Sequence, residues 1–202
     1  LLDVCGHGIG AALLSISVTN TLRSESLNHV DFNDPGQVLA ELNQIFKMEN
    51  HNNMYFTIWY GVYHKQKGEI TYAGGGHPPA IAITGDSPET AKLVKLPGEG
   101  FIIGAIPDRK YPVSSFSLKP FTRLFIYSDG IYEIDGCGEK VCTVEDFVGV
   151  VSDLFRENRA HVNSIIDIMQ SRQGKEIFVD DVSILEIEFA LSGHNPQDSQ
   201  EA

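Results

Sequence analysis

The chain begins with the sequence LLDVCGHGIGAALL, residues 1–14, which predicts a buried strand, a glycine-rich turn and a helix in direct succession. Asp3 lies in the apolar run of the strand, residues 1–5. The glycines at positions 6, 8 and 10 let the backbone turn tightly and approach a ligand closely. A helix N-terminus at this turn favours anions. The segment therefore predicts either a plain strand-to-helix turn capped by Asp3 or one side of a ligand site.

Two more acidic segments adjoin apolar runs farther along the chain: FIYSDG at residues 125–130 and FVDDVS at residues 178–183. Taken alone, Asp129-Gly130 is typical of a turn, and Asp180-Asp181 fits a loop or a strand edge. Adjacent carboxylates repel each other, however, unless one of them meets a cation. Because Mg²⁺ and Mn²⁺ take oxygen ligands, Asp3, Asp129 and Asp180 together predict a divalent-cation site.

The composition is that of one enzyme-sized domain. A chain of 202 residues, 42% of them hydrophobic, can bury a sizeable core, which we place in residues 1–190. The polar residues 191–202 predict a disordered tail. The formal net charge of −12 argues against nucleic acid and anionic membranes as partners. No apolar run reaches the roughly 20 residues of a membrane helix, so we expect no membrane insertion.

The cysteines are odd in number and lack metal-finger spacing. They are Cys5, Cys137 and Cys142, and we expect reduced thiols in a cytoplasmic protein. Beside the glycine turn, Cys5 is expected to be a small, half-buried residue and not a nucleophile.

Hydrophobic periodicity predicts an α+β fold in which strands dominate the middle of the chain. One helix is expected over residues 9–27 with an apolar face of Ile9, Ala12, Leu13, Ile16 and Thr19. Another starts at Asn33 or Asp34, before Pro35, with a stripe from Val38 to Phe46. Thr143 and Asp146 resemble a capping box for a helix to about Phe155. A last helix is expected at 161–172, and strands at 55–63, 69–73, 79–84, 92–96, 111–118, 122–128 and 182–189.

In this order, the motifs of the chain resemble those of bacterial SpoIIE/RsbU-type serine/threonine phosphatases, a branch of the PP2C-like (PPM) family. The resemblance covers most of residues 1–189. It rests on the segments DVCGHGIGAALL (3–14), MYFT (54–57), AGGGHPP (73–79), GAIP (104–107), YSDGIYE (127–133) and DDVS (180–183). It implies a PP2C-like β-sandwich of antiparallel sheets flanked by helices.

The resemblance also implies a chemistry and a set of ligands. Asp3 would bridge two Mn²⁺ or Mg²⁺ ions, the backbone carbonyl of Val4 would bind one of them, and Asp129 and Asp180 would hold the other. Two such cations can polarise a phosphoryl group and lower the pKa of a bridging water for in-line attack, so no phosphoenzyme is needed. The implied substrate is a phosphoserine or phosphothreonine of a regulatory protein, of the anti-sigma-factor antagonist type.

The family pattern includes a further acidic motif before the position of Asp3, where this chain has no residues. We therefore expect an N-terminally incomplete domain, cut from a protein with an upstream sensor or receiver domain. A homodimer is also compatible with the sequence. Two other interpretations stay open: a degenerate phosphatase fold that binds its partner without hydrolysis, and a nucleotide-binding domain that uses the glycine turn. His7 could contact phosphate or only shape its turn, while His77 is expected to be structural, with its ring bonded to backbone in a sharp turn.

Overall fold

The computed structural model describes residues 1–137 and 140–190 and divides the chain into two compact units. Unit 1 contains Leu1–Pro79 and Leu96–Leu118, and unit 2 contains Ala80–Lys95 and the chain from Lys119 onward. The tail expected at 191–202 lies outside the described residues. Each unit has its own antiparallel sheet with two helices packed on it, which confirms the α+β prediction.

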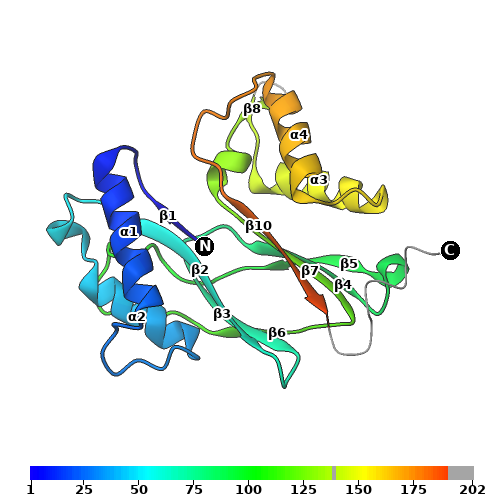
Figure 1. Ribbon diagram of the computed structural model, residues 1–202. Helices are drawn as coiled ribbons and strands as arrows, with labels where there is room; N and C mark the ends of the chain where they lie inside the picture. Colours follow the sequence, from blue (N-terminus) through cyan, green and yellow to red (C-terminus); the bar gives the residue numbers. More distant parts are fainter. Residues whose placement is uncertain (138–139, 191–202) are drawn as a thin grey trace. The chain divides into compact units, whose positions relative to one another are not determined.

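The sheet of unit 1 has the strand order β1-β2-β3-β6 and is seen in Figure 1 beside helices α1 and α2. The strands are β1 (Leu2–Val4), β2 (Phe56–His64), β3 (Glu69–Gly75) and β6 (Ser114–Ser117). Aromatic and aliphatic side chains of β2 and β3 supply the buried surface, with Phe56, Ile58 and Ala73 inaccessible or nearly so. The strand expected at 111–118 is confirmed only in its second half.

Helix α1 (Ile9–Arg23) packs through a different face from the one that its apolar pattern predicts. Ala11, Leu14 and Val18 are buried, while Ile9, Leu13 and Ile16 are 82%, 61% and 56% exposed. The predicted face was wrong because both stripes are apolar at helical spacing, and spacing alone does not say which one meets the sheet. The helix also ends at Arg23, four residues before the predicted end at Leu27.

Helix α2 (Pro35–Ile45) starts as the sequence predicts. Its N-cap is Asp34, whose Oδ1 accepts hydrogen bonds from the amides of Gly36 at 2.9 Å and Gln37 at 3.2 Å. Val38, Leu39, Leu42 and Phe46 of the predicted stripe are buried, whereas Ile45 is exposed. The 3₁₀ turn η1 (Met48–Asn50) follows.

Replacing Asp34 by alanine is expected to lower the free energy of unfolding by about 1 kcal/mol, because two helix amides lose their acceptor. Urea unfolding followed by circular dichroism measures this change. The Asp34→Asn variant keeps an acceptor oxygen and should stay close to the wild-type protein. Equal stability of the alanine variant and the wild-type protein would contradict the capping role.

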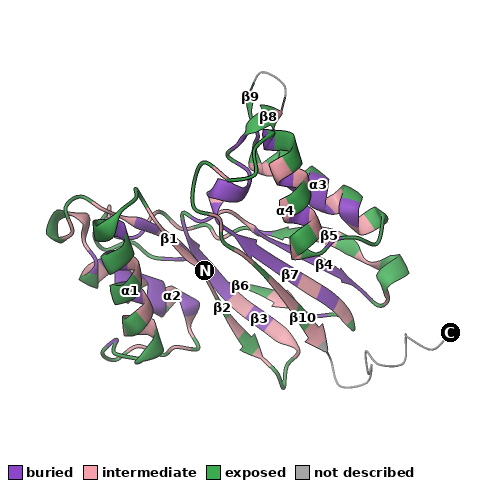
Figure 2. Ribbon diagram, turned by 45° about the horizontal axis from the view of Figure 1, so that its top comes forward, coloured by how far each residue is buried: buried purple, intermediate pink, exposed green. Residues whose placement is uncertain are grey.

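The sheet of unit 2 has the order β10-β7-β4-β5 and packs against α3 (Val144–Arg156) and α4 (Val162–Gln173). The strands are β4 (Ala80–Gly85), β5 (Lys92–Leu96), β7 (Phe121–Tyr127) and β10 (Ile184–Ala190). All residues of β4 are buried, as are residues 124–127 of β7, and Figure 2 shows these stretches in purple. The capping box of Thr143 and Asp146 at the start of α3 is confirmed.

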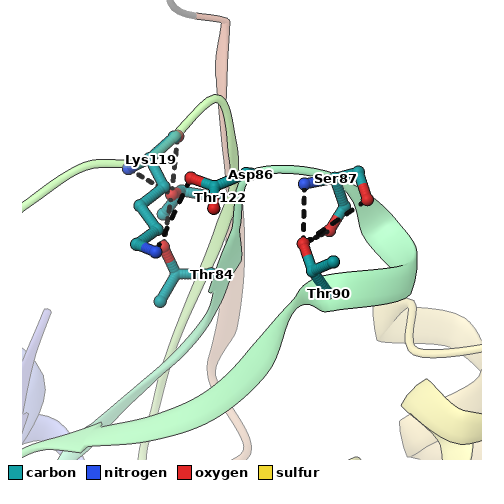
Figure 3. A network of polar contacts seen from close by, with 6 residues as sticks. All are labelled: Thr84, Asp86, Ser87, Thr90, Lys119 and Thr122. Atoms are coloured by element: carbon teal, nitrogen blue, oxygen red, sulfur yellow. Dashed lines mark hydrogen bonds and ion pairs between the residues drawn. The ribbon is translucent and has the colours of Figure 1, made fainter.

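Buried polar groups between β4 and β7 satisfy one another, as Figure 3 shows. Thr84 and Thr122 face each other across the strand pair, with their hydroxyl oxygens 2.8 Å apart. Thr122 also bonds the backbone of Lys119, and Lys119 Nζ lies 3.6 Å from Asp86. That ion pair is exposed and contributes little. Beside it, Ser87 and Thr90 cap the 3₁₀ turn η2 (Pro88–Thr90).

The prediction of three reduced thiols is wrong for Cys137 and Cys142, which form a disulfide. The sequence analysis missed the small hairpin of β8 (Asp135–Cys137) and β9 (Lys140–Val141), which brings the two Cα atoms to 5.1 Å, within disulfide range. Cys5 is free and exposed, not half-buried as expected. The cysteines therefore no longer support a cytoplasmic location.

In the part of the chain that the structure describes, none of the helices combines the length and the apolar character needed to cross a membrane.

Candidate metal centre

Asp129 lies two residues after β7, one of the two inner strands of the unit 2 sheet. Strand β7 ends at Tyr127, and Asp129 opens the 3₁₀ turn η3 (Asp129–Ile131), so the half-buried carboxylate emerges where the buried strand stops. Ile131 and Tyr132 then return to the core. The turn is held by backbone hydrogen bonds from the amides of Tyr132 and Glu133 to the carbonyl of Asp129, at 2.9 and 2.8 Å.

Ser128 binds the Asp129 turn to the Asp180 segment, although the two lie about 50 residues apart in sequence. Its backbone amide donates to the carbonyl of Ser183 at 2.9 Å, and its Oγ accepts from the amide of Ser183 at 2.9 Å. Its hydroxyl also donates to the carbonyl of Asp181 at 3.3 Å. The side chain of Ser128 is buried, so these bonds are shielded from water.

Gly130 also lies at the contact between the Asp129 turn and the Asp180 segment. A Cβ at this position would lie 2.4 Å from the carbonyl oxygen of Asp181 and 3.4 Å from Cβ of Asp180. Only a residue without a side chain lets the two acidic segments approach this closely. The pairing of β7 with β10 continues this approach through the sheet.

Glu133 is a third carboxylate at this junction. Partial burial raises its pKa, and the negative charges of Asp129 and Asp180 raise it further. A like-charge effect of this kind requires the three groups to lie near one another. The sequence analysis quoted Glu133 within a motif but gave it no role. Its position four residues after Asp129, at the spacing of one turn, was the signal that could have found it.

Asp3 lies in β1 of unit 1, opposite Thr57 of β2. The following turn needs glycine, because Gly6 and Gly8 have φ values of 87° and 91°. Gly8 is the N-cap of α1 and provides no side-chain cap. Asp3 and Val4 thus belong to one unit, and Asp129 and Asp180 to the other, and the structure describes each pair within its own unit.

The histidines of the motifs differ in burial. His77 is buried, and its Nδ1 lies 2.9 Å from Oγ1 of Thr57, the residue that faces Asp3 across β1 and β2. A structural role agrees with this burial, but the ring partner is a side chain and not the expected backbone. His7 is exposed in the glycine turn.

A second group of metal-ligating residue types lies on β10 and at the start of α4. Ligand atoms of His161, Glu186 and Glu188 lie within 4.8 Å of one another. Arg123 already offsets part of the negative charge of this group, because its Nε is 2.8 Å from Glu188 and its guanidinium 4.0 Å from Glu186. We therefore interpret it as an ion-pair network.

The carboxylates near Asp129 have a different electrostatic setting. Within residues 1–137 and 140–190, no lysine, arginine or histidine forms an ion pair with Asp129, Glu133 or Asp180. Carboxylate oxygens without a protein cation suit a hard divalent ion such as Mg²⁺ or Mn²⁺, so the chemistry of these donors agrees with the metal that the motifs imply. Among the described residues, their ligand atoms do not form a group within 4.8 Å of one another, as those of His161, Glu186 and Glu188 do.

Comparison with known proteins identifies the fold and the family. Over 131 residues, 65% of this chain and 37% of the relative, the chain is 29% identical to phosphoserine phosphatase RsbU of Bacillus subtilis, so it spans about a third of that protein. The SiaA-PP2C domain of Pseudomonas aeruginosa superposes with a TM-score of 0.71 at 19% identity, covering 93% of this chain and 74% of that one. RsbX, solved in complex with magnesium, superposes with a TM-score of 0.58 at 15% identity, covering 93% and 78%.

These structural likenesses confirm the predicted PP2C-like fold. The family model described as Stage II sporulation protein E (SpoIIE) matches residues 1–190, a range that includes all the described residues. The chain therefore belongs to the SpoIIE family, and its fold is PP2C-like.

Proposed function

We propose that the chain is the catalytic domain of a metal-dependent protein phosphatase that acts on phosphoserine or phosphothreonine. The observation that carries this proposal is the junction of Asp129, Glu133 and Asp180 in unit 2. Hydrogen bonds of the buried Ser128 hold the two acidic segments together there, and Gly130 leaves room for their close approach. Burial raises the pKa of Glu133, and the negative charges of Asp129 and Asp180 raise it further. Such repulsion between carboxylates destabilises a fold unless a bound cation offsets it.

The proposed ligands are those that the family motifs imply. From these motifs, Asp129 and Asp180 would hold one Mn²⁺ or Mg²⁺ ion, and Asp3 and the backbone carbonyl of Val4 would provide ligands for a second ion. When bound, the two ions would neutralise phosphoryl charge and lower the pKa of a water for in-line attack. The support comes from the oxygen donors of the unit 2 junction and from family membership.

The protein's own residues supply the positioning. Ser128 fixes the end of β7 against residues 181–183, and this sets the separation of the Asp129 and Asp180 backbones. Gly130 keeps the gap between the segments small. In unit 1, pairing with β2 keeps Asp3 extended, and the two left-handed glycines turn the chain into α1 immediately afterwards. Asp3 therefore lies on a strand and Asp129 two residues after one, while Asp180 lies in the loop before β10 that Ser128 binds through residues 181–183.

The proposed substrate is a phosphorylated regulatory protein of the anti-sigma-factor antagonist type. The similarity to phosphoserine phosphatase RsbU supports this class. The net charge of −12 would repel a phosphorylated partner unless metal ions supply local positive charge. We therefore expect both the binding of the substrate and its hydrolysis to depend on the bound metal ions.

The test is hydrolysis of p-nitrophenyl phosphate by the purified protein as a function of Mn²⁺ concentration. The proposal predicts turnover that rises with Mn²⁺ and saturates. Absence of turnover at every Mn²⁺ concentration, together with retained binding of a phosphoserine protein, would instead identify a binding module without catalysis.

A further inference from the structure

The loop between α4 and β10 carries two exposed apolar side chains immediately before Asp180. In Figure 1 it is the orange segment that connects these two elements. Ile177 and Val179 are 81% and 73% exposed, while Phe178 between them packs against the core of unit 2. The chain alternates here between inside and outside as a strand does, and the outward positions of such a segment are usually polar. Two outward aliphatic residues are therefore unusual.

Hydrogen bonds from α4 hold the backbone of this loop, so Ile177 and Val179 project from a fixed position. Gln170 Nε2 on α4 donates to the carbonyl of Glu176 at 2.7 Å, and Gln173 Nε2 donates to the carbonyl of Ile177 at 2.8 Å. Gly174 ends α4 in the left-handed conformation, with φ of 70°, and directs the chain back along the helix. Together with Phe178, these contacts fix the backbone from which Ile177 and Val179 project.

A shallow cavity of about 370 Å³, widely open to solvent, lies beside these residues and is lined by the segment 176–182 and by Gln170. The charged groups among its described lining residues are all carboxylates, those of Glu176, Asp180 and Asp181. An occupant that presents apolar surface together with Lys or Arg would match both properties of this cavity. A free phosphate ion matches neither.

We propose that this surface, defined by Ile177, Val179 and Glu176, recognises the residues next to the phosphoserine in the protein substrate. The inference rests on the proposed function, because it takes Asp180 as a metal ligand. Val179 is adjacent to Asp180, and Ile177 is three residues away, so both lie within about 11 Å of it along the chain. An extended peptide spans roughly 3.3 Å per residue. The recognised side chains therefore lie two or three residues from the phosphoserine: an aliphatic residue against Ile177 and Val179, and a Lys or Arg towards Glu176.

Two synthetic peptides test the proposal, each with a single phosphoserine. One carries leucine and lysine two and three residues from the phosphoserine, and the other carries glycine and serine there. The wild-type protein should prefer the first peptide about tenfold in kcat/KM, which is the order expected for burying one leucine side chain. The double variant Ile177→Ser, Val179→Ser should lose this preference while its p-nitrophenyl phosphate turnover stays unchanged.

The matched control is Val141→Ser, which changes an exposed valine of β9 in the same unit and should keep the preference. Fluorescence anisotropy of the same labelled peptides gives the ratio of their dissociation constants without any need for turnover. Absence of p-nitrophenyl phosphate hydrolysis by the wild-type protein would contradict the proposed function, and the anisotropy ratio would still test the surface. An equal ratio in the wild-type protein and the double variant, or no preference in the wild-type protein, would overturn the inference.

Discussion

Replacing Asp129 or Asp180 by asparagine is expected to lower kcat/KM for Mn²⁺-dependent hydrolysis of p-nitrophenyl phosphate by more than about 100-fold. Asparagine keeps the size of the side chain but removes its negative charge and one ligand oxygen, and a hard divalent cation binds weakly without both. The fold should survive, because Asp129 is only half-buried and Asp180 is exposed. Steady-state kinetics over a Mn²⁺ titration measure the loss and show whether a higher metal concentration restores part of it.

Asp181 provides the matched control for this experiment. It is exposed, lies next to Asp180, and contributes its backbone carbonyl to Ser128 but no proposed ligand. The Asp181→Asn variant should therefore keep turnover close to that of the wild-type protein. Unchanged turnover in both Asp129→Asn and Asp180→Asn, or an equal loss in all three variants, would contradict the assignment of ligands.

The Gly130→Ala variant is expected to damage stability and activity together. Its new Cβ would lie 2.4 Å from the carbonyl oxygen of Asp181, which is backbone and cannot move aside cheaply. Overpacking of this kind costs about 1–3 kcal/mol in the free energy of unfolding. Because relief requires the two acidic segments to separate, we also expect kcat/KM to fall by at least about tenfold, as for a group that orients a metal ligand. Urea unfolding and steady-state kinetics measure the two effects.

Gly149 on α3 is the control for Gly130. Its Cβ would meet nothing within 4 Å, so Gly149→Ala should preserve activity and stabilise the helix by roughly 0.5–1 kcal/mol. A Gly130→Ala variant that matches this behaviour would show that the close approach of the two acidic segments has no role.

Elements that depend on local chemistry were predictable from the sequence. Asp34 before Pro35 and the pair Thr143 and Asp146 are helix starts whose caps involve neighbours within three residues. The strand predicted at 92–96 is confirmed at both ends. Long-range choices were less predictable. Whether α1 buries Leu14 or Leu13 is decided by the sheet beneath it, and the helix pattern alone contains no information about that sheet.

For the candidate site, the sequence predicted the residues that stand in motifs and missed those that matter only through long-range contacts. The motifs predicted Asp129 and Asp180 as metal ligands, and these roles also stay predictions; the structure shows that Ser128 and Gly130 let their two segments approach each other. Glu133 was missed because its raised pKa comes from burial and from the charges of Asp129 and Asp180, which only the folded chain brings to it. The disulfide was missed because the hairpin that brings Cys137 to Cys142 is short and weakly patterned. The roles of Asp3 and Val4 remain predictions from the family motifs.

The most direct test of the central claim is the initial rate of phosphate release from a phosphoserine peptide by the purified protein. The rate is measured without metal, with Mn²⁺, and after addition of EDTA to the Mn²⁺ sample. The account predicts no release without metal, release with Mn²⁺ and its loss on chelation, with the Asp180→Asn variant inactive throughout. Release that persists in EDTA, or an Asp180→Asn variant as active as the wild-type protein, would contradict it.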